Sequence, residues 1–167
     1  MKILLRYCER YSLFILITLF FLANLVVIDW FPLWRDESFS VLVARNDLST
    51  ISSMLSQDVH PPLHTYLLHY WSILFGDSVV SVRMLSVLFG VGALLMVNKI
   101  AEFLYPNSRW AAVAATGLVA SAPFVLYQSI EARAYSLLLF AHTGTVWAIL
   151  LLNSAQRKKS HSAAFIF

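Results

Sequence analysis

Residues 11–28 read YSLFILITLFFLANLVVI, a run without a single charged residue. As a helix this run rises about 27 Å, close to the roughly 30 Å hydrocarbon core of a bilayer. Lys2, Arg6 and Arg10 precede it, as they would in a secretory signal. The run is longer than a signal core, however, and residues 29–32 (DWFP) do not form a small-residue cleavage site. The stretch therefore predicts a retained transmembrane helix.

The rest of the chain is also strongly apolar. Of its 167 residues 59% are hydrophobic, and the mean hydropathy is +0.71. A soluble domain of this length could not bury so much apolar surface. Residues 79–104, 110–126 and 134–152 are further uncharged or nearly uncharged runs long enough to cross a membrane. The sequence predicts an all-α, polytopic transmembrane protein with about four spanning helices.

Charge and cysteine content exclude other classes. The single cysteine, Cys8, cannot form an internal disulfide or a metal framework. The net charge of +3 is small, and no basic stripe with interleaved aromatic residues indicates nucleic-acid binding.

The segment after the first helix is polar. Apolar residues at helical spacing predict two short amphipathic helices within residues 35–60, and Asp47 is suited to cap the second. Residues 63–75 are apolar but would reach only about 20 Å as a helix. The predicted layout is a first membrane helix with its flanks (1–34), an extracytoplasmic loop (35–78), three membrane helices (79–153), and a cytoplasmic link with the start of a further helix (154–167).

Residues 63–75 decide between two topologies. If they do not cross and the N-terminus is cytoplasmic, eight basic residues lie inside and four outside; if they cross, the counts are five and seven. The positive-inside rule favours the first arrangement. In that arrangement the polar motifs share the extracytoplasmic face of the cell membrane: Asp36, Glu37, Asp58, His60, Arg83, Glu131 and Arg133.

Adjacent carboxylates at Asp36 and Glu37 are candidates for general-base work. A carboxylate beside another acid or in apolar surroundings can have its pKa raised toward neutrality. In the alternative interpretation, Asp36 caps the next helix and Glu37 is solvated. Spacing alone favours this alternative.

Three further ionisable residues lie beside predicted spanning helices. Glu131 and Arg133 precede the last span, where charges are costly and usually functional. They are two residues apart, so they should project to different faces, one toward a site and the other supporting it. Arg83 could hold a phosphate or extend its charge to the interface.

A metal site is the least supported possibility. Asp58, His60 and His64 offer ligand atoms, but two prolines intervene and the spacing matches no known ligand pattern. The sequence therefore predicts no cofactor, with a divalent metal as the alternative.

Four short motifs occur in a fixed order: WRDES at 34–38, DVHPPL at 58–63, LFGD at 74–77 leading to VRMLS at 82–86, and EARAY at 131–135. On this membrane framework, their order resembles the N-terminal part of GT-C membrane glycosyltransferases. The similarity is greatest to the protein O-mannosyltransferase-like and aminoarabinose-transferase-like enzymes, and it covers nearly the whole chain.

This resemblance implies transfer of a sugar, with inversion, from a polyprenyl-phosphate carrier to an extracytoplasmic acceptor that is a protein, lipid or glycan. Asp36 would activate the acceptor hydroxyl, and Glu37 would support it. His60 would shape the floor of the site. The residues that would hold the lipid phosphate or order the first loop are Arg83, Glu131 and Arg133.

Members of this family are several hundred residues long and have more spanning helices, so we expect the chain to hold the first part of such an enzyme, as a truncated product, a fragment or a pseudogene remnant. The competing hypothesis is a non-enzymatic membrane module, either a transporter fragment or an assembly subunit. A transporter would carry polar residues near the bilayer midplane. The polar motifs here gather at one interface, which favours the enzyme.

Overall fold

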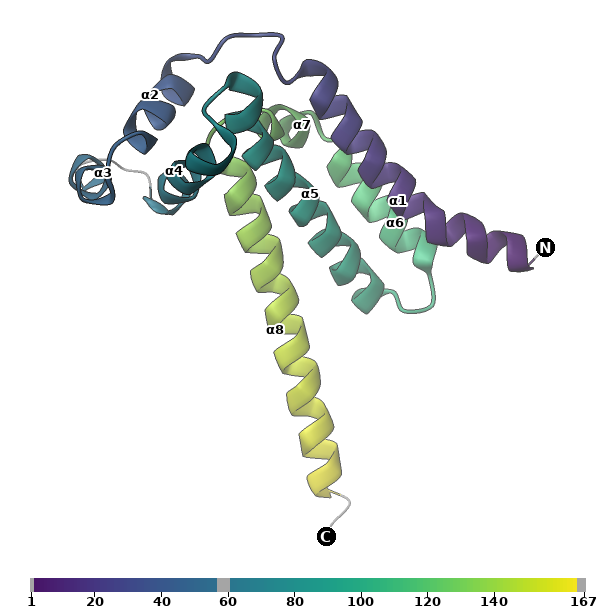
Figure 1. Ribbon diagram of the computed structural model, residues 1–167. Helices are drawn as coiled ribbons and strands as arrows, with labels where there is room; N and C mark the ends of the chain where they lie inside the picture. The colour runs from purple at the N-terminus through teal and green to yellow at the C-terminus, as the bar shows by residue number, and fades with distance from the viewer. Residues whose placement is uncertain (1, 57–60, 165–167) are drawn as a thin grey trace.

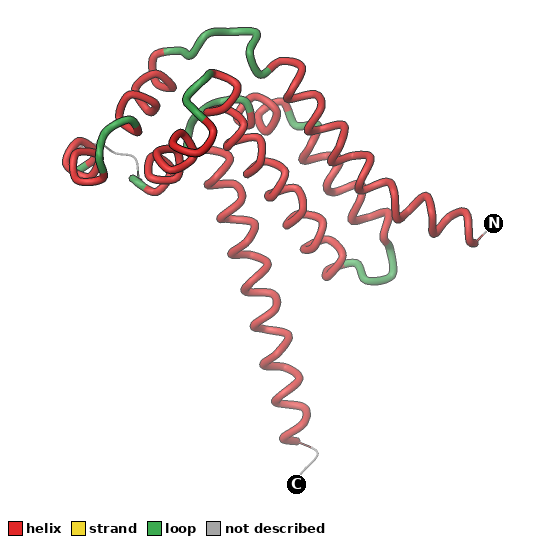
Figure 2. The backbone as a smooth tube through the Cα atoms, in the orientation of Figure 1, coloured by secondary structure: helices red, strands yellow, loops and turns green. Residues whose placement is uncertain are grey.

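The structure is a computed structural model that describes residues 2–56 and 61–164, with the backbone alone for 2–10 and 157–164. All regular secondary structure in this part of the chain is helical (Figure 2). The predicted all-α class is therefore confirmed. The helices are α1 (Lys2–Val27), α2 (Arg35–Ala44), α3 (Leu48–Leu55), α4 (Leu63–Phe75), α5 (Val79–Leu104), α6 (Arg109–Ala120), α7 (Pro123–Ser129) and α8 (Tyr135–Ala164).

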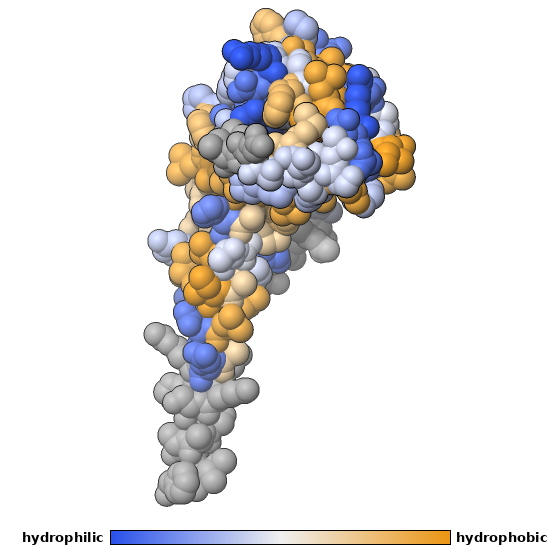
Figure 3. Space-filling view, turned by 90° about the vertical axis from the view of Figure 1, so that its left-hand side faces the viewer, coloured by the Kyte–Doolittle hydropathy of each residue, from blue (hydrophilic) through white to orange (hydrophobic). Residues whose placement is uncertain are grey.

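The long helices converge at one end of the molecule (Figure 1). There α1 ends, α5 and α8 begin, and the short helices α2, α3 and α4 gather; the turn between α5 and α6 lies at the other end. We call the first of these the α2–α4 end. The space-filling view shows many hydrophilic atoms on this wide end and prominent hydrophobic patches along the narrower part below it (Figure 3).

Membrane spans are identifiable by length and composition. Within the described residues, α5 and residues 135–156 of α8 are long and apolar enough to cross a bilayer, and α6 with α7 makes a third if the bent pair is one span. The described side chains of α1 form a shorter apolar helix, Tyr11–Val27. In the most apolar stretch of α8, only 6% of the residues are buried by the rest of the protein. This exposure is expected for a helix that is surrounded by lipid.

The span predicted over residues 110–126 is not one continuous helix. It breaks between α6 and α7, which meet at an angle of 65°. Pro123 explains the break, because its nitrogen has no hydrogen to donate and its ring would clash with the carbonyl of residue 119 in a continuing helix. Ala122 accordingly adopts an extended conformation (φ −64°, ψ 123°), the usual one before proline.

The far end of α8 also differs from the predicted layout. The helix continues without a break through residue 164, across the region where a link and the start of a further helix were expected. The further helix was expected to begin within residues 163–167, of which residues 165–167 lie outside the described residues.

The two amphipathic helices predicted after the first span are present as α2 and α3. Asp47 caps α3, since its Oδ2 accepts hydrogen bonds from the backbone N–H groups of Ser49 (3.1 Å) and Thr50 (3.2 Å). Buried apolar side chains on the inner faces join α2, α4 and α5 into one core, which includes Val41, Leu68, Val82, Leu85 and Ala132.

Helix α4 does not cross the molecule. Arg45, which follows α2, pairs with Asp77, which follows α4, at 2.6 Å. Because Arg45 follows α2 and Asp77 follows α4, this pair places the end of α4 beside the end of α2. Whether residues 63–75 cross the membrane, and the orientation of the chain, stay predictions.

A glycine sets the spacing between α5 and α7. A Cβ atom at Gly90 would lie 2.7 Å from the Ser129 hydroxyl oxygen, closer than real contacts allow. The absence of a side chain therefore lets the end of α7 approach α5. This approach carries residues 130–134 across to the loop that precedes α2.

Candidate functional site

The loop between α1 and α2 is held by Arg83 of α5. Its Nη1 donates to the carbonyl oxygens of Ile28 (2.7 Å) and Phe31 (2.9 Å), and its Nη2 to that of Pro32 (3.2 Å). Its Nε and Nη2 also donate to the carboxylate of Glu37 at 2.8 and 2.6 Å. A guanidinium group has five N–H donors, and these five bonds use one donor each.

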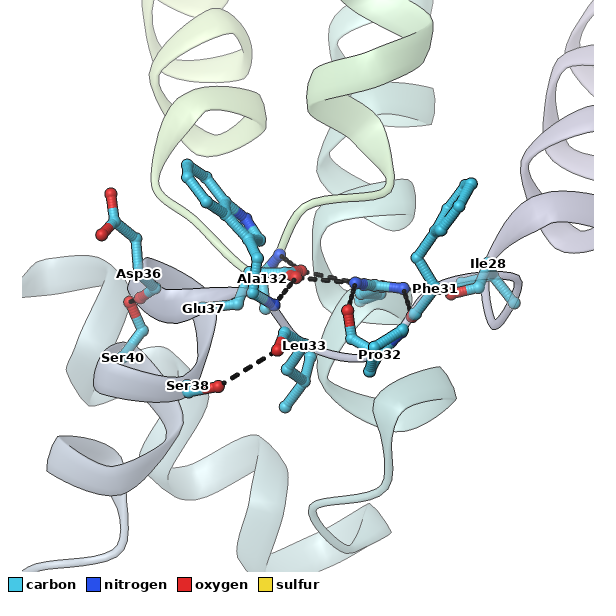
Figure 4. A network of polar contacts seen from close by, with 11 residues as sticks. Ile28, Phe31, Pro32, Leu33, Asp36, Glu37, Ser38, Ser40 and Ala132 are labelled. Carbon is cyan, nitrogen blue, oxygen red and sulfur yellow. Dashed lines mark hydrogen bonds and ion pairs between the residues drawn. The ribbon is translucent and has the colours of Figure 1, made fainter.

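Glu37 is the acceptor at the centre of this network and is fully buried. Besides Arg83, its carboxylate accepts from the backbone N–H of Ala132 (2.8 Å) and of Trp34 (3.3 Å). We call Glu37, Arg83 and Ala132, with the carbonyl groups of residues 28, 31 and 32, the Glu37 clamp (Figure 4). The clamp joins the first loop, α2, α5 and the 130–134 turn at one point.

The clamp keeps Glu37 ionised. Burial raises the pKa of this carboxyl group, but the hydrogen bonds from Arg83, Ala132 and Trp34 and the charge of Arg83 outweigh burial, and the pKa lies below its usual value. The interpretation that left Glu37 solvated is therefore wrong. Removing one partner from such a buried pair typically costs about 3–5 kcal/mol, since the other charge is left uncompensated.

Asp36 points away from the clamp (Figure 4). Its side chain is 44% exposed and lies 3.6 Å from Nη1 of Arg133, which also reaches the Asp36 carbonyl oxygen at 3.4 Å. Asp36 is not the cap of α2, because the N-cap position belongs to Trp34. The Asp36 carboxylate is therefore exposed, on a helix turn whose position is fixed by the buried neighbour Glu37.

Glu131 and Arg133 lie on opposite sides of Ala132, as their spacing predicted. Glu131 is buried, hydrogen-bonds the Tyr127 phenol, and lines an open pocket with Trp34 and the Glu37 clamp. Burial raises the pKa of Glu131; the Tyr127 bond opposes the rise, while the negative charge of Glu37 adds to it. Arg133 faces the other way, toward Asp36 and a second pocket that contains His64.

The sequence analysis missed two residues of this region. Tyr127 was not considered as a site residue, although it lies only four residues before Glu131. His64 was considered only as a metal ligand, yet it is buried between the short helices. Nothing in its sequence context distinguishes a buried histidine from an exposed one.

The remaining predicted site residues are not placed. His60 and Asp58 lie outside the described residues. Within residues 2–56 and 61–164, no three His, Cys, Asp or Glu side chains gather as a metal site would require. The metal and cofactor predictions therefore stay predictions.

Fold and site together define an α-helical membrane protein with a buried arginine–glutamate clamp and an exposed carboxylate at one end. The family model described as dolichyl-phosphate-mannose-protein mannosyltransferase matches residues 59–167, well over half of the chain. The chain belongs to this family, which is of the GT-C glycosyltransferase type. The match includes Arg83, Glu131 and Arg133, whereas Asp36 and Glu37 precede it. No curated protein and no solved structure matches the chain.

Proposed function

We propose that this chain forms the acceptor-activating part of a glycosyltransferase that moves a sugar from a polyprenyl-phosphate carrier to a hydroxyl group on the extracytoplasmic side of the membrane. Membership of the mannosyltransferase family supports this reaction class. A lipid-anchored donor needs a site at the edge of the bilayer, and the α2–α4 end, where three apolar helices begin or end, provides one.

The observation that carries the proposal is the contrast between Asp36 and its neighbour. Glu37 is buried and fully engaged, whereas Asp36 projects an exposed carboxylate from the same rigid helix turn. A general base must reach its proton and hold its position, and a turn anchored by a buried ion pair meets both needs.

In the proposed reaction, Asp36 is the general base. Asp36 accepts the proton of the acceptor hydroxyl as that oxygen attacks the anomeric carbon of the sugar. The bond between the anomeric carbon and the carrier phosphate breaks, and the phosphate leaves with the electron pair. Attack from the face opposite the phosphate inverts the anomeric centre. Positive charge stabilises the leaving phosphate.

Arg133 is assigned to orienting the Asp36 carboxylate, because inversion places the leaving phosphate on the opposite side of the anomeric carbon from this base. Its guanidinium lies beside Asp36, and its contacts to Asp36 are long, at 3.4 and 3.6 Å. Arg83 is assigned a positioning role, because its five N–H donors are used within the clamp. His60 remains our candidate for the floor of the site. Glu131 is our candidate for a contact to the donor, because it lines the open pocket beside Trp34 and the Glu37 clamp.

The decisive experiment measures sugar transfer by the complete protein in membranes. The Asp36→Asn variant should lose at least about a hundredfold in rate, the contribution typical of a positioned general base. Asp29→Asn is the matched control, because Asp29 is an exposed acid before the same helix. Unchanged transfer by Asp36→Asn, at equal protein level, would remove Asp36 from the catalytic role.

Orientation is tested separately by cysteine labelling in a Cys8→Ser background. We expect an impermeant reagent to reach a cysteine at position 77 from outside the cell and not one at position 158. The expectation rests on the positive-inside rule and on the joint location of Arg45 and Asp77 at the α2–α4 end. Labelling of position 158 from outside would reverse the proposed orientation.

A further inference from the structure

The open pocket beside Glu131 has aromatic rings in its lining. Its volume is about 270 Å³, near the lower end of the range for small-molecule sites. Phe31, Trp34 and Tyr127 line it and are 69%, 47% and 57% exposed, so their rings are not taken up by core packing. Figure 4 shows the Phe31 ring standing clear of the hydrogen-bonded groups of the clamp. We call this cavity the Glu131 pocket.

The acid in this pocket has no counter-charge. Glu131 is only 5% exposed and is hydrogen-bonded by the Tyr127 phenol, but none of the described residues forms an ion pair with it. Arg83 also lines the pocket, yet its donors are used within the clamp and its charge is balanced by Glu37. Burying an unpaired carboxylate is costly, and this cost raises the pKa of Glu131. The pocket therefore suits a positively charged ligand.

An ammonium group fits both features of the pocket. Aromatic faces attract ammonium groups, and apolar surroundings strengthen this attraction. A primary ammonium also has three N–H donors, which the Glu131 carboxylate can accept. A divalent metal ion is less suited, because it prefers several oxygen ligands and the second carboxylate of the lining, that of Glu37, is already engaged in the clamp.

An apolar groove lies next to this pocket, between α1 and the α6–α7 pair. Figure 1 shows α1 beside α6, and α1 contacts both α6 and α7. On α1, Ala23 of the groove is one helical turn from Val27 of the pocket. On α7, Leu126 of the groove is followed directly by Tyr127 of the pocket. The groove and the Glu131 pocket are therefore neighbours on both of these helices.

The groove has the length and the character of a site for an acyl chain. Its lining covers residues 12–23 of α1, which rise about 17 Å as a helix. This is close to half of the roughly 30 Å hydrocarbon core, the depth of one leaflet. The lining is almost wholly apolar, with Ser12 and Ser121 as its polar residues. Because α1 and the α6–α7 pair are apolar helices of a membrane protein, lipid chains are the available occupant.

We propose that the Glu131 pocket and the groove together bind one membrane phospholipid whose headgroup carries a primary ammonium. The ammonium lies at Glu131, and an acyl chain lies along α1. Repulsion by the carboxylates keeps the lipid phosphate outside the pocket. The inference does not rest on the proposed function, because Asp36 points away from the clamp (Figure 4). A donor that contacts Glu131 would have to displace the headgroup, so this lipid would compete with it.

Native mass spectrometry of the complete protein in detergent micelles measures lipid binding without any sugar transfer. The probes are phosphatidylethanolamine, phosphatidylcholine and phosphatidylglycerol with identical acyl chains. We expect phosphatidylethanolamine to bind most tightly, because the choline headgroup has no N–H to donate and the glycerol headgroup has no positive charge. Equal binding of the three lipids overturns the proposal, as does a preference for either of the other two.

The acid is tested by an isosteric substitution. Glu131→Gln should weaken phosphatidylethanolamine binding by about tenfold to a hundredfold, the range for losing hydrogen bonds to a charged group. Asp29→Asn is the matched control, because Asp29 is an exposed acid that follows α1 and does not line the pocket. Asp36→Asn should also bind the lipid as the wild type does, so loss of transfer and loss of binding are distinguishable. A preference that persists unchanged in Glu131→Gln overturns the proposal.

Two exposed positions test the site independently of the buried acid. Phe31→Leu removes one ring and should weaken binding by about twofold to fivefold, whereas Phe14→Leu, at an equally exposed position outside both linings, should not. Ala23→Phe fills the groove and should weaken binding of all three lipids, whereas Ala114→Phe, on the exposed side of α6, should not. Wild-type binding in both Phe31→Leu and Ala23→Phe overturns the proposal, even if Glu131→Gln does not fold.

Discussion

Two neighbouring carboxylates in the first turn of α2, Glu37 and Asp36, each pair with an arginine from another part of the chain. The two pairs have the same chemistry but different environments. Arg83 and Glu37 are joined at 2.6 Å with side chains 7% and 0% exposed; Arg133 and Asp36 are 3.6 Å apart with side chains 11% and 44% exposed. The first pair is saturated with hydrogen bonds, whereas the second, looser pair makes a longer contact and leaves the Asp36 carboxylate exposed. The comparison indicates that the buried pair fixes the geometry of this helix turn.

The largest effect should come from breaking the buried pair. Arg83→Gln leaves Glu37 buried without a counter-charge, so we expect a loss of about 3–5 kcal/mol in unfolding free energy. Thermal unfolding in detergent or nanodiscs measures this loss. The double variant Arg83→Met/Glu37→Leu removes both charges and should recover part of it. An unchanged unfolding temperature in Arg83→Gln would show that the clamp does not stabilise the loop.

The looser pair should behave in the opposite way. Arg133→Gln should lower sugar transfer by about tenfold to a hundredfold, as expected for losing charge-assisted hydrogen bonds, and lower the unfolding temperature less than Arg83→Gln does. Arg133→Lys should fall between the two proteins, because it keeps the charge and loses the planar fork. If Arg133→Gln unfolded as readily as Arg83→Gln, the distinction between the pairs would fail.

Lowering the pH should weaken the stabilisation that the buried Arg83–Glu37 pair contributes. The pKa of Glu37 is lowered in the folded protein from its usual 4.5, so its stabilising contribution is present above that value. The contribution is lost as pH falls through the lower, folded-state pKa. Unfolding temperature measured from pH 7 to pH 3 should decline less steeply in Glu37→Gln than in the wild type. Parallel profiles would argue that Glu37 does not titrate with unfolding.

The smallest effect is expected at a third pair, Arg45–Asp77. Its partners are 2.6 Å apart, as close as Arg83 and Glu37, but their side chains are 56% and 44% exposed. Exposed pairs contribute about 0–1 kcal/mol, so Arg45→Ala should change the unfolding temperature by little. A loss comparable to that of Arg83→Gln would mean that distance, rather than burial, sets the strength of these pairs.

The framework of the fold was predictable because hydropathy and helix signals act locally. The bounds of α4 and the cap at Asp47 follow from features within a few residues of each end. The break between α6 and α7 was missed even though Pro123 is visible in the sequence. The prediction gave more weight to the length of the apolar run than to its single proline. A proline inside a helix removes one backbone hydrogen bond and clashes with the preceding turn, so the helix breaks there.

The site was predictable as a set of residues but not as a division of roles. Spacing alone placed Glu131 and Arg133 on different sides, and the structure agrees. Spacing could not decide whether Arg83 binds a phosphate or the first loop, because the answer depends on three carbonyl groups more than fifty residues away in sequence. The pocket around His64 depends likewise on how three short helices meet.

The bond from Ala132 to Glu37 comes from the main chain, and this origin affects how the site would evolve. Any residue except proline supplies the same N–H, so the bond itself does not depend on the side chain at position 132. The fully buried Cβ of Ala132 restricts this position to small residues for a separate reason, packing in the core of α2, α4 and α5. Correlated substitutions between positions 37 and 132 would then be absent despite direct contact. Covariation between positions would therefore not reveal this contact between the 130–134 turn and Glu37. Substitution of each residue of the turn by proline would reveal it, because proline at position 132 removes the N–H donor.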